Sequence, residues 1–187
     1  MKRYPLLLIC LLASLSSKAQ DDERLALSRD VAAQIGQELS AALLTALGTD
    51  GPVEAIGVCS VEASPIAARL SEQTGAGVGR TALRIRNPDN APDEMAREVM
   101  DAFARDLAAG ATAPPEHFET RPDGSARYMS AIVTQPLCVT CHGSEIAPEV
   151  ATAIAGHYPS DQATGFAVGD LRGAFIVEWP ASEAQGQ

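Results

Sequence analysis

The sequence predicts an α+β fold with an antiparallel sheet, because its helical patterns come mainly first and its strand patterns come later. Residues 22–47 place leucine, isoleucine and valine at helical spacing, which predicts a long amphipathic N-terminal helix. Residues 116–121 and 126–133 flank Pro122-Asp123-Gly124, a typical hairpin turn. These observations favour a sheet built from neighbouring strands with helices packed beside it.

The remaining elements follow in order along the chain. Residues 53–73 predict a second helical region, broken near Ser64-Pro65, and residues 78–86 alternate as a strand does. Asn90 and Asp93 can cap a helix over about residues 92–109. Later segments predict a turn over residues 138–143 and a short helix over residues 148–156. A last strand pair is predicted over residues 166–168 and 174–179, and a disordered tail over residues 181–187.

Residues 1–19 have the layout of a secretory signal peptide. Lys2 and Arg3 precede an apolar run over residues 6–15, and small residues precede a cut after Ala19. The apolar run is too short to cross a bilayer. We therefore expect a periplasmic protein with one domain over residues 20–180, after the signal peptide has been cleaved.

The charge of this mature chain excludes two classes of partner. Removal of residues 1–19 leaves 168 residues with 11 arginines against 24 acidic residues, a net charge of −13. Such a chain has no electrostatic attraction for nucleic acid or for an anionic membrane surface. Its later segments contain no apolar run long enough to span a membrane.

The motif CVTCHG, residues 138–143, is compatible with disulfide exchange, half of a zinc site, or covalent attachment of a c-type haem. Cys59, Cys138 and Cys141 are the cysteines of the mature chain, and an exported domain with an odd number is not a simple disulfide framework. A zinc site would need a fourth ligand, and no second paired spacing is present. A thioredoxin-type site would lie in a βαβ unit, which this chain lacks. Haem attachment is the predicted chemistry.

Helical geometry explains the spacing of this motif. Cys138 and Cys141, three residues apart, present both sulfurs to the two vinyl groups, and His142 reaches the iron from the same side. Gly143 lets the chain leave the turn without a Cβ clash. The ligand opposite His142 stays open at this point. Met95, Met100 and His117 have better explanations as core or surface residues, which leaves Cys59, Met129 and His157.

Four segments, in order, resemble a known family: AIGVCSVEASPIA, VGRTALRIRNPDNAPD, CVTCHG and GFAVGDLRGAFIV. It is the single-haem c-type family long catalogued as a domain of unknown function. Its members are free exported proteins, including one associated with cyanobacterial photosystems, and sensor domains of histidine kinases. The resemblance implies a PAS-like sheet with flanking helices and one covalent haem c. It also implies attachment at Cys138 and Cys141, with His142 and Cys59 as iron ligands.

Arg80, Arg84 and Arg86 alternate along the strand predicted over residues 78–86, where they would form one basic face. A solvated sheet face is one interpretation. The other is that some of them pair with the haem propionates, since a guanidinium suits a carboxylate. Arg80 and Arg86 match the family's pattern around RNP and are the predicted partners. Arg172 is a weaker candidate.

Two functions of different classes follow. One is an exported electron carrier with an unidentified redox partner, in which the iron changes oxidation state and no substrate is transformed. The other is a redox or diatomic-gas sensor, in which loss of Cys59 from the iron alters the contact with a signalling protein. An enzyme is not expected, because six-coordinate iron leaves no open site.

Overall fold

The structure, a computed structural model, describes residues 6–181; within this range the side chains of residues 6–17, Cys59 and Ser60 are not described. The start of the predicted leader and residues 182–187 of the predicted tail therefore lie outside the described residues. The helices and strands are α1 (Leu6–Thr49), α2 (Pro52–Val61), α3 (Ala63–Thr74), β1 (Gly77–Thr81), the 3-10 helix η1 (Pro88–Asn90), α4 (Glu94–Ala108), β2 (Glu116–Thr120), β3 (Ala126–Val133), α5 (Val139–His142), α6 (Pro148–His157) and β4 (Leu171–Trp179).

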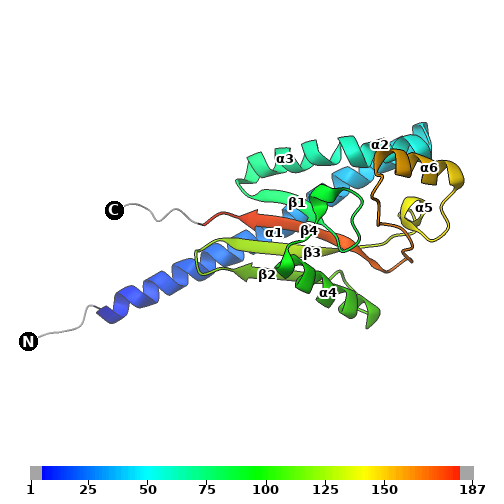
Figure 1. The fold of residues 1–187 in the computed structure, drawn as a ribbon. Coiled ribbons are helices and arrows are strands. Elements are labelled where there is room, and N and C mark those ends of the chain that lie inside the picture. Colours follow the sequence, from blue (N-terminus) through cyan, green and yellow to red (C-terminus); the bar gives the residue numbers. More distant parts are fainter. Residues whose placement is uncertain (1–5, 182–187) are drawn as a thin grey trace, which may run out of the picture.

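The described strands form one antiparallel sheet in the order β1-β4-β3-β2. Figure 1 shows α1 and α3 on one side of this sheet and α4 on the other, with α5 and α6 beyond one end. Phe118 pairs with Tyr128, so β2 and β3 form the predicted hairpin around Pro122-Asp123-Gly124. The predicted fold class, an antiparallel sheet with flanking helices and a long N-terminal helix, is confirmed.

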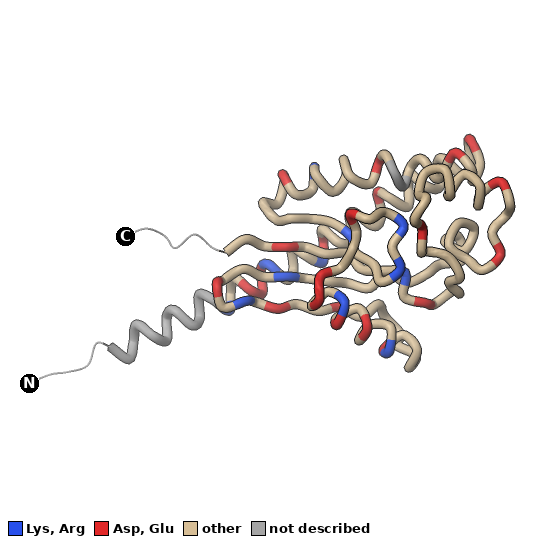
Figure 2. The backbone as a smooth tube through the Cα atoms, in the orientation of Figure 1, with Lys and Arg blue, Asp and Glu red and all other residues tan. Residues whose placement is uncertain are grey.

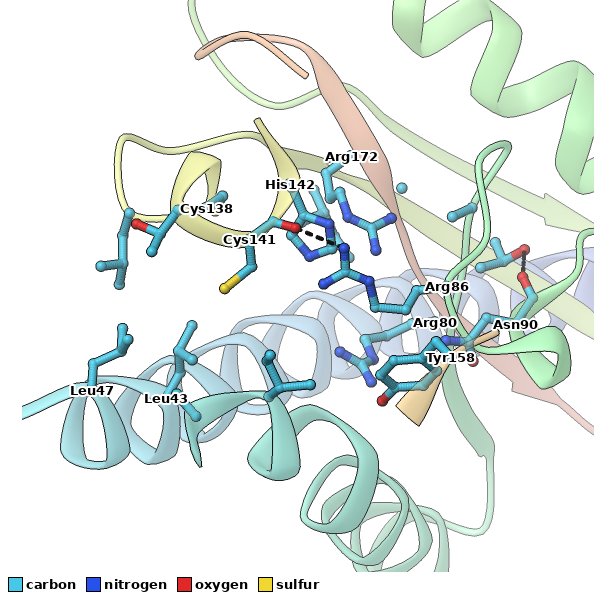
Figure 3. A pocket seen from close by; sticks show the side chains of 18 residues that line it. Leu43, Leu47, Arg80, Arg86, Asn90, Cys138, Cys141, His142, Tyr158 and Arg172 are labelled. Carbon is cyan, nitrogen blue, oxygen red and sulfur yellow. Dashed lines mark hydrogen bonds between the residues drawn. The ribbon is translucent and has the colours of Figure 1, made fainter. Parts of the chain in front are cut away.

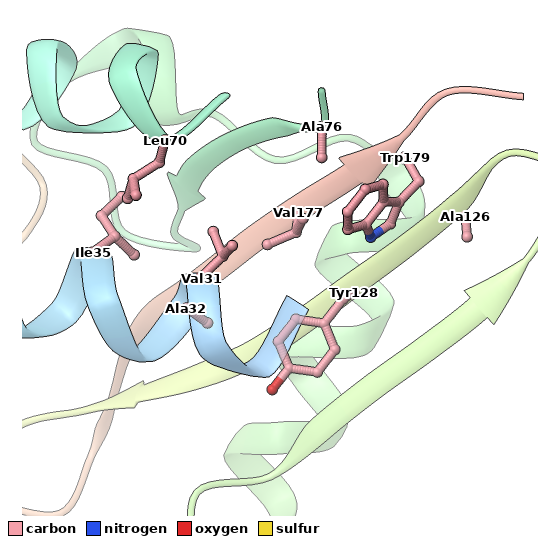
Figure 4. Packing of buried hydrophobic residues seen from close by; sticks show 9 residues of the cluster. All are labelled: Val31, Ala32, Ile35, Leu70, Ala76, Ala126, Tyr128, Val177 and Trp179. Atoms are coloured by element: carbon pink, nitrogen blue, oxygen red, sulfur yellow. The ribbon is translucent and has the colours of Figure 1, made fainter. Parts of the chain in front are cut away.

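The core on the α1 side explains why this helix is amphipathic. Ile35 of α1 and Leu70 of α3 are fully buried beside Val177 and Trp179 of β4 (Figure 4). Burial of each large aliphatic side chain contributes about 2 kcal/mol. The indole of Trp179 donates a hydrogen bond to Ser28 Oγ at 2.8 Å, which satisfies this buried donor.

A second core lies on the α4 side. Ala96, Met100 and Phe103 of α4 pack with Met129 of β3 and Ala174 of β4. The N-cap of α4 is Asp93, whose Oδ1 accepts a hydrogen bond from Ala96 N at 2.8 Å. The helix predicted over residues 92–109 is thus confirmed within the usual uncertainty at helix ends.

Two predicted strands are wrong in extent. The strand predicted over residues 78–86 ends at Thr81, because the chain then turns, and Ala82 N donates to Asn90 O instead of to a neighbouring strand. Residues 166–168 are not a strand, since Phe166 N donates to His142 O. The single break predicted at Ser64-Pro65 occurs at Glu62, which leaves Pro65 in the tolerant first turn of α3.

The described helices include none that is both long and apolar enough to traverse a bilayer.

Candidate haem site

The candidate site is a cavity at the end of the sheet, between the C-terminal part of α1, helix α2 and the turn that carries CVTCHG (Figure 3). Apolar side chains form much of its wall. Helices α1 and α2 contribute them from one side, and the end of β3 with the turn after it contributes them from the other. These lining residues are Leu43, Leu47, Ala55, Ile56, Ile132 and Leu137.

The CVTCHG turn places both cysteines at the cavity. Cys138 precedes the single-turn helix α5, and its carbonyl accepts hydrogen bonds from Cys141 N and His142 N. Cys138 and Cys141 are half-buried, and both line the cavity. A Cβ on Gly143 would lie 2.5 Å from Val139 O, so the predicted need for glycine after the histidine is confirmed.

His142 is held in one orientation and in one protonation state. Its Nδ1 lies 2.7 Å from the carbonyl oxygen of Ala163, so Nδ1 carries the proton and donates it to that oxygen. Burial, together with the charges of Arg172 and Arg86, lowers the pKa of His142 to about 3. The imidazole is therefore neutral near pH 7, and the lone pair of Nε2 is available to a metal ion.

The donor set fits a c-type haem. A neutral imidazole follows directly on two thiols one helical turn apart, and the three side chains line the same cavity. The apolar walls suit a porphyrin face, and Arg80 and Arg172 add positive charge to the same lining. A metal-ion cluster is a poorer fit: the described residues contain no group of three or more histidine, cysteine or acidic side chains that could hold one.

The arginines do not form the single basic face that alternation predicted. Arg80 lies on β1 and lines the cavity, whereas Arg84 and Arg86 lie in the loop beyond the strand. Arg84 is exposed; its guanidinium carbon stacks 3.5 Å from the centroid of the Phe166 ring. Figure 2 shows acidic residues on segments throughout the molecule and a group of basic residues in this loop. The prediction of a shared strand face is therefore wrong, because β1 ends at Thr81, before Arg84 and Arg86.

Arg86 is buried, and its guanidinium group is paired with other groups of the protein. Its side chain is 8 % exposed, and it forms an ion pair with Asp161, whose side chain is 9 % exposed. Its Nη2 also donates to the carbonyl oxygen of Cys141 at 2.7 Å (Figure 3). The solvated-face interpretation thus does not apply to Arg86. Asp161 and Ala163 had no motif to mark them in the sequence.

The alternative iron ligands lie elsewhere. Met100 and Met129 are fully buried in the core on the α4 side. His117 is on the outer strand β2 near Glu119, and His157 is exposed at the end of α6. Among the side chains that the structure describes, none of these four lines the cavity. Cys59 is a residue of α2, but its side chain lies outside the described part of the chain.

Comparisons with known proteins identify the family of this chain. A family model described as Tll0287-like matches residues 13–180. The chain belongs to the Tll0287-like family. A solved structure, that of the cyanobacterial heme-protein Tll0287, is similar to this chain with a TM-score of 0.67 and 26 % sequence identity, over 88 % of this chain and 98 % of that one. No curated protein matches the chain. Tll0287-like membership confirms the recognised haem-protein family.

Proposed function

We propose that this Tll0287-like protein is an exported c-type cytochrome with one covalent haem, which carries electrons in the periplasm and transforms no substrate. The observation that carries the proposal is the convergence of Cys138, Cys141 and a neutral His142 on one largely apolar cavity. The haem protein Tll0287 supports the cofactor, and the leader-like residues 1–19 support export.

Each part of the cavity has a task in this proposal. The thiols of Cys138 and Cys141 form the thioether bonds, and His142 supplies the proximal nitrogen through Nε2. Leu43, Leu47 and the other apolar side chains exclude water from the site, which favours fast electron exchange with little solvent rearrangement. A haem bound here would supply an iron that alternates between the ferric and ferrous states.

Cys59 is proposed as the sixth ligand. Ala55 and Ile56 of α2 line the cavity, and position 59 follows them by four and three residues in the same helix. Residues at this spacing share one side of a helix. The resemblance to the family implies the same residue, and the described alternatives Met129 and His157 do not line the cavity.

The first test concerns attachment. Protein matured with a cytochrome c assembly system is run on a denaturing gel and stained for haem peroxidase activity. The wild-type polypeptide should keep its stain, and Cys138→Ala or Cys141→Ala should lose most of the holoprotein. Cys59→Ala is the matched control, because it removes a thiol without removing a thioether. Haem that washes out of the wild type with acid and organic solvent would refute covalent attachment.

The second test concerns the iron ligand. Electron paramagnetic resonance of the ferric wild type should show a low-spin His/thiolate signature that disappears in Cys59→Ser. A thiolate stabilises ferric iron, so the reduction potential should rise in the variant. His/Met or bis-His spectra that are unchanged in Cys59→Ser would assign the position to another residue.

A sensor is the second candidate, and one observation favours it. Leu43 and Leu47, in the last turns of the long helix α1, line the cavity, so a change at the iron could be transmitted along a continuous helix. Carbon monoxide separates the two functions. Reversible redox cycling without binding of carbon monoxide to the ferrous protein supports the carrier. Binding that displaces Cys59 supports the sensor.

A further inference from the structure

Arg86 and Asp161 form a buried ion pair that connects the loop after β1 with the loop after α6. Arg86 Nε lies 3.1 Å from Asp161 Oδ1, and Arg86 Nη2 lies 3.0 Å from Asp161 Oδ2, so the contact is bidentate. The two side chains are 8 % and 9 % exposed. Burial of two charges is costly unless geometry and further hydrogen bonds compensate for it, and such a pair needs an explanation beyond surface solvation.

Further hydrogen bonds from this pair lead to His142. Asp161 Oδ1 accepts from Ala163 N at 2.9 Å, and Arg86 Nη2 donates to Ala163 O at 3.3 Å. The same Ala163 oxygen accepts the Nδ1 proton of His142 at 2.7 Å. Arg86 Nη2 also donates to Cys141 O at 2.7 Å, next to His142 in the chain. The ion pair therefore holds Ala163 through both its N–H group and its carbonyl group. This carbonyl group orients the imidazole of His142.

We propose that the Arg86–Asp161 pair positions His142 and that the balance of its two charges sets the reduction potential of the haem. This assigns Arg86 to the proximal side of the site, as a positioning residue, instead of to a haem propionate. The inference rests on the proposed function, because it requires a haem bound through His142. Partners that orient a ligating histidine are known to tune the metal that it binds.

The two charges should act in opposite directions. Replacement of Asp161 by asparagine leaves an uncompensated cation near the iron, which disfavours the ferric state and raises the potential. Replacement of Arg86 by glutamine leaves an uncompensated anion, which favours the ferric state and lowers it. A pair that only stabilised the loop would not produce shifts of opposite sign.

The test measures the reduction potential and the ferric paramagnetic resonance spectrum of holoprotein for wild type, Arg86→Gln, Asp161→Asn and the double variant. We expect a lower potential in Arg86→Gln, a higher one in Asp161→Asn, and a value between them in the double variant. Arg86→Lys keeps the charge without the bidentate geometry, so its potential should lie closer to wild type than that of Arg86→Gln, with an altered spectrum. If Arg86→Gln does not fold, Asp161→Asn and Arg86→Lys still decide the sign.

Arg127→Gln is the matched control. Arg127 is also a buried arginine, 7 % exposed and paired with Asp93 and Glu178, but it does not line the cavity. Its loss should lower the free energy of unfolding and leave the potential unchanged. Shifts of the same sign in Arg86→Gln and Asp161→Asn, or no shift in either, overturn the inference alone. A wild type without covalent haem overturns the proposed function and this inference together.

Discussion

At the scale of single residues, Gly143 lies where a side chain would clash with the backbone. An alanine Cβ there would lie 2.5 Å from Val139 O and 3.1 Å from Val139 Cβ, both in the turn that carries the cysteines. Gly143→Ala should lower the free energy of unfolding by about 1–3 kcal/mol and reduce the yield of holoprotein. Urea denaturation measures the first effect, and haem absorbance measures the second.

Gly156→Ala is the control for this change. Gly156 lies inside α6, and a Cβ there would meet nothing within 4 Å. Alanine is the better helix former by about 0.5–1 kcal/mol, so this variant should be neutral or slightly more stable. Equal stability of the two variants would show that the turn yields easily at Gly143.

Ser28 supports a second prediction at the residue scale. It is fully buried, and its hydroxyl accepts the hydrogen bond of Trp179 Nε1. Ser28→Ala should cost about 1–3 kcal/mol, because it leaves a buried indole donor without a partner. Trp179 is the one tryptophan of the sequence, so its fluorescence during denaturation reports this loss directly. The exposed Ser144→Ala should have no such effect.

At the scale of elements, Asp93 attaches helix α4 to the sheet. This carboxylate caps α4 and accepts hydrogen bonds from Arg127 of β3 at 2.9 Å and 2.6 Å. The Arg127 hydrogen bonds lower the pKa of Asp93 to about 2 from an ordinary value of 3.8. A carboxyl with a lowered folded-state pKa stabilises the fold above its unfolded pKa, and this contribution is lost as the pH falls from about 4 to about 2.

Asp93→Asn should test this contribution, because asparagine keeps the cap and removes the charge. The variant should be less stable than wild type at pH 7, by less than the pKa difference alone implies, since the Asp93 side chain is 55 % exposed. The difference in unfolding free energy should shrink below pH 4. A difference that stays constant between pH 7 and pH 3 would exclude the ion pair as its source.

Local patterns predicted the elements whose hydrogen bonds are also local. The hairpin of β2 and β3 and the capped helix α4 agree with the prediction, since turn and cap residues are adjacent to the elements that they define. The segment after Thr81 alternates as a strand does but is not one. Ala82 N donates to Asn90 O, and Ile85 O accepts from Gln162 N, a distant partner that no local pattern reveals.

At the scale of the whole molecule, the candidate site also has a part that local sequence patterns predicted and a part that depends on distant partners. Cys138, Cys141 and His142 were predicted from one contiguous motif, and the cavity brings them together. Asp161 could not be predicted, because its ion pair joins residues 75 apart in the chain. Leu47 was placed on a helix by its spacing, but no pattern in the sequence shows that the helix end lines a cavity.

Removal of residues 1–19 should leave the fold intact. Figure 1 shows the first turns of α1 projecting beyond the sheet. Arg24 ties the helix to the domain, since it donates to Gly124 O at 2.8 Å and to Pro180 O at 3.0 Å. A chain that starts at residue 20 should therefore unfold with the same urea midpoint as the full chain. Arg24→Ala should lower the free energy of unfolding by about 1–3 kcal/mol. A lower midpoint in the shortened chain would contradict the proposed cleavage site.

The pairing of Val133 with Leu171 makes the segment that carries CVTCHG a closed loop of the chain. Residues 134–170 leave the sheet at one central strand and return at its neighbour, and closing a loop of this length costs about 3 kcal/mol of chain entropy. This entropy has already been lost once β3 and β4 have paired. The loop over residues 134–170 can therefore open locally and expose both thiols while the strands of the sheet stay paired. Hydrogen exchange of haem-free protein should therefore protect the amides of these two strands while those of α5 and α6 exchange quickly. Uniform protection throughout would mean that the loop over residues 134–170 opens only when the entire domain unfolds.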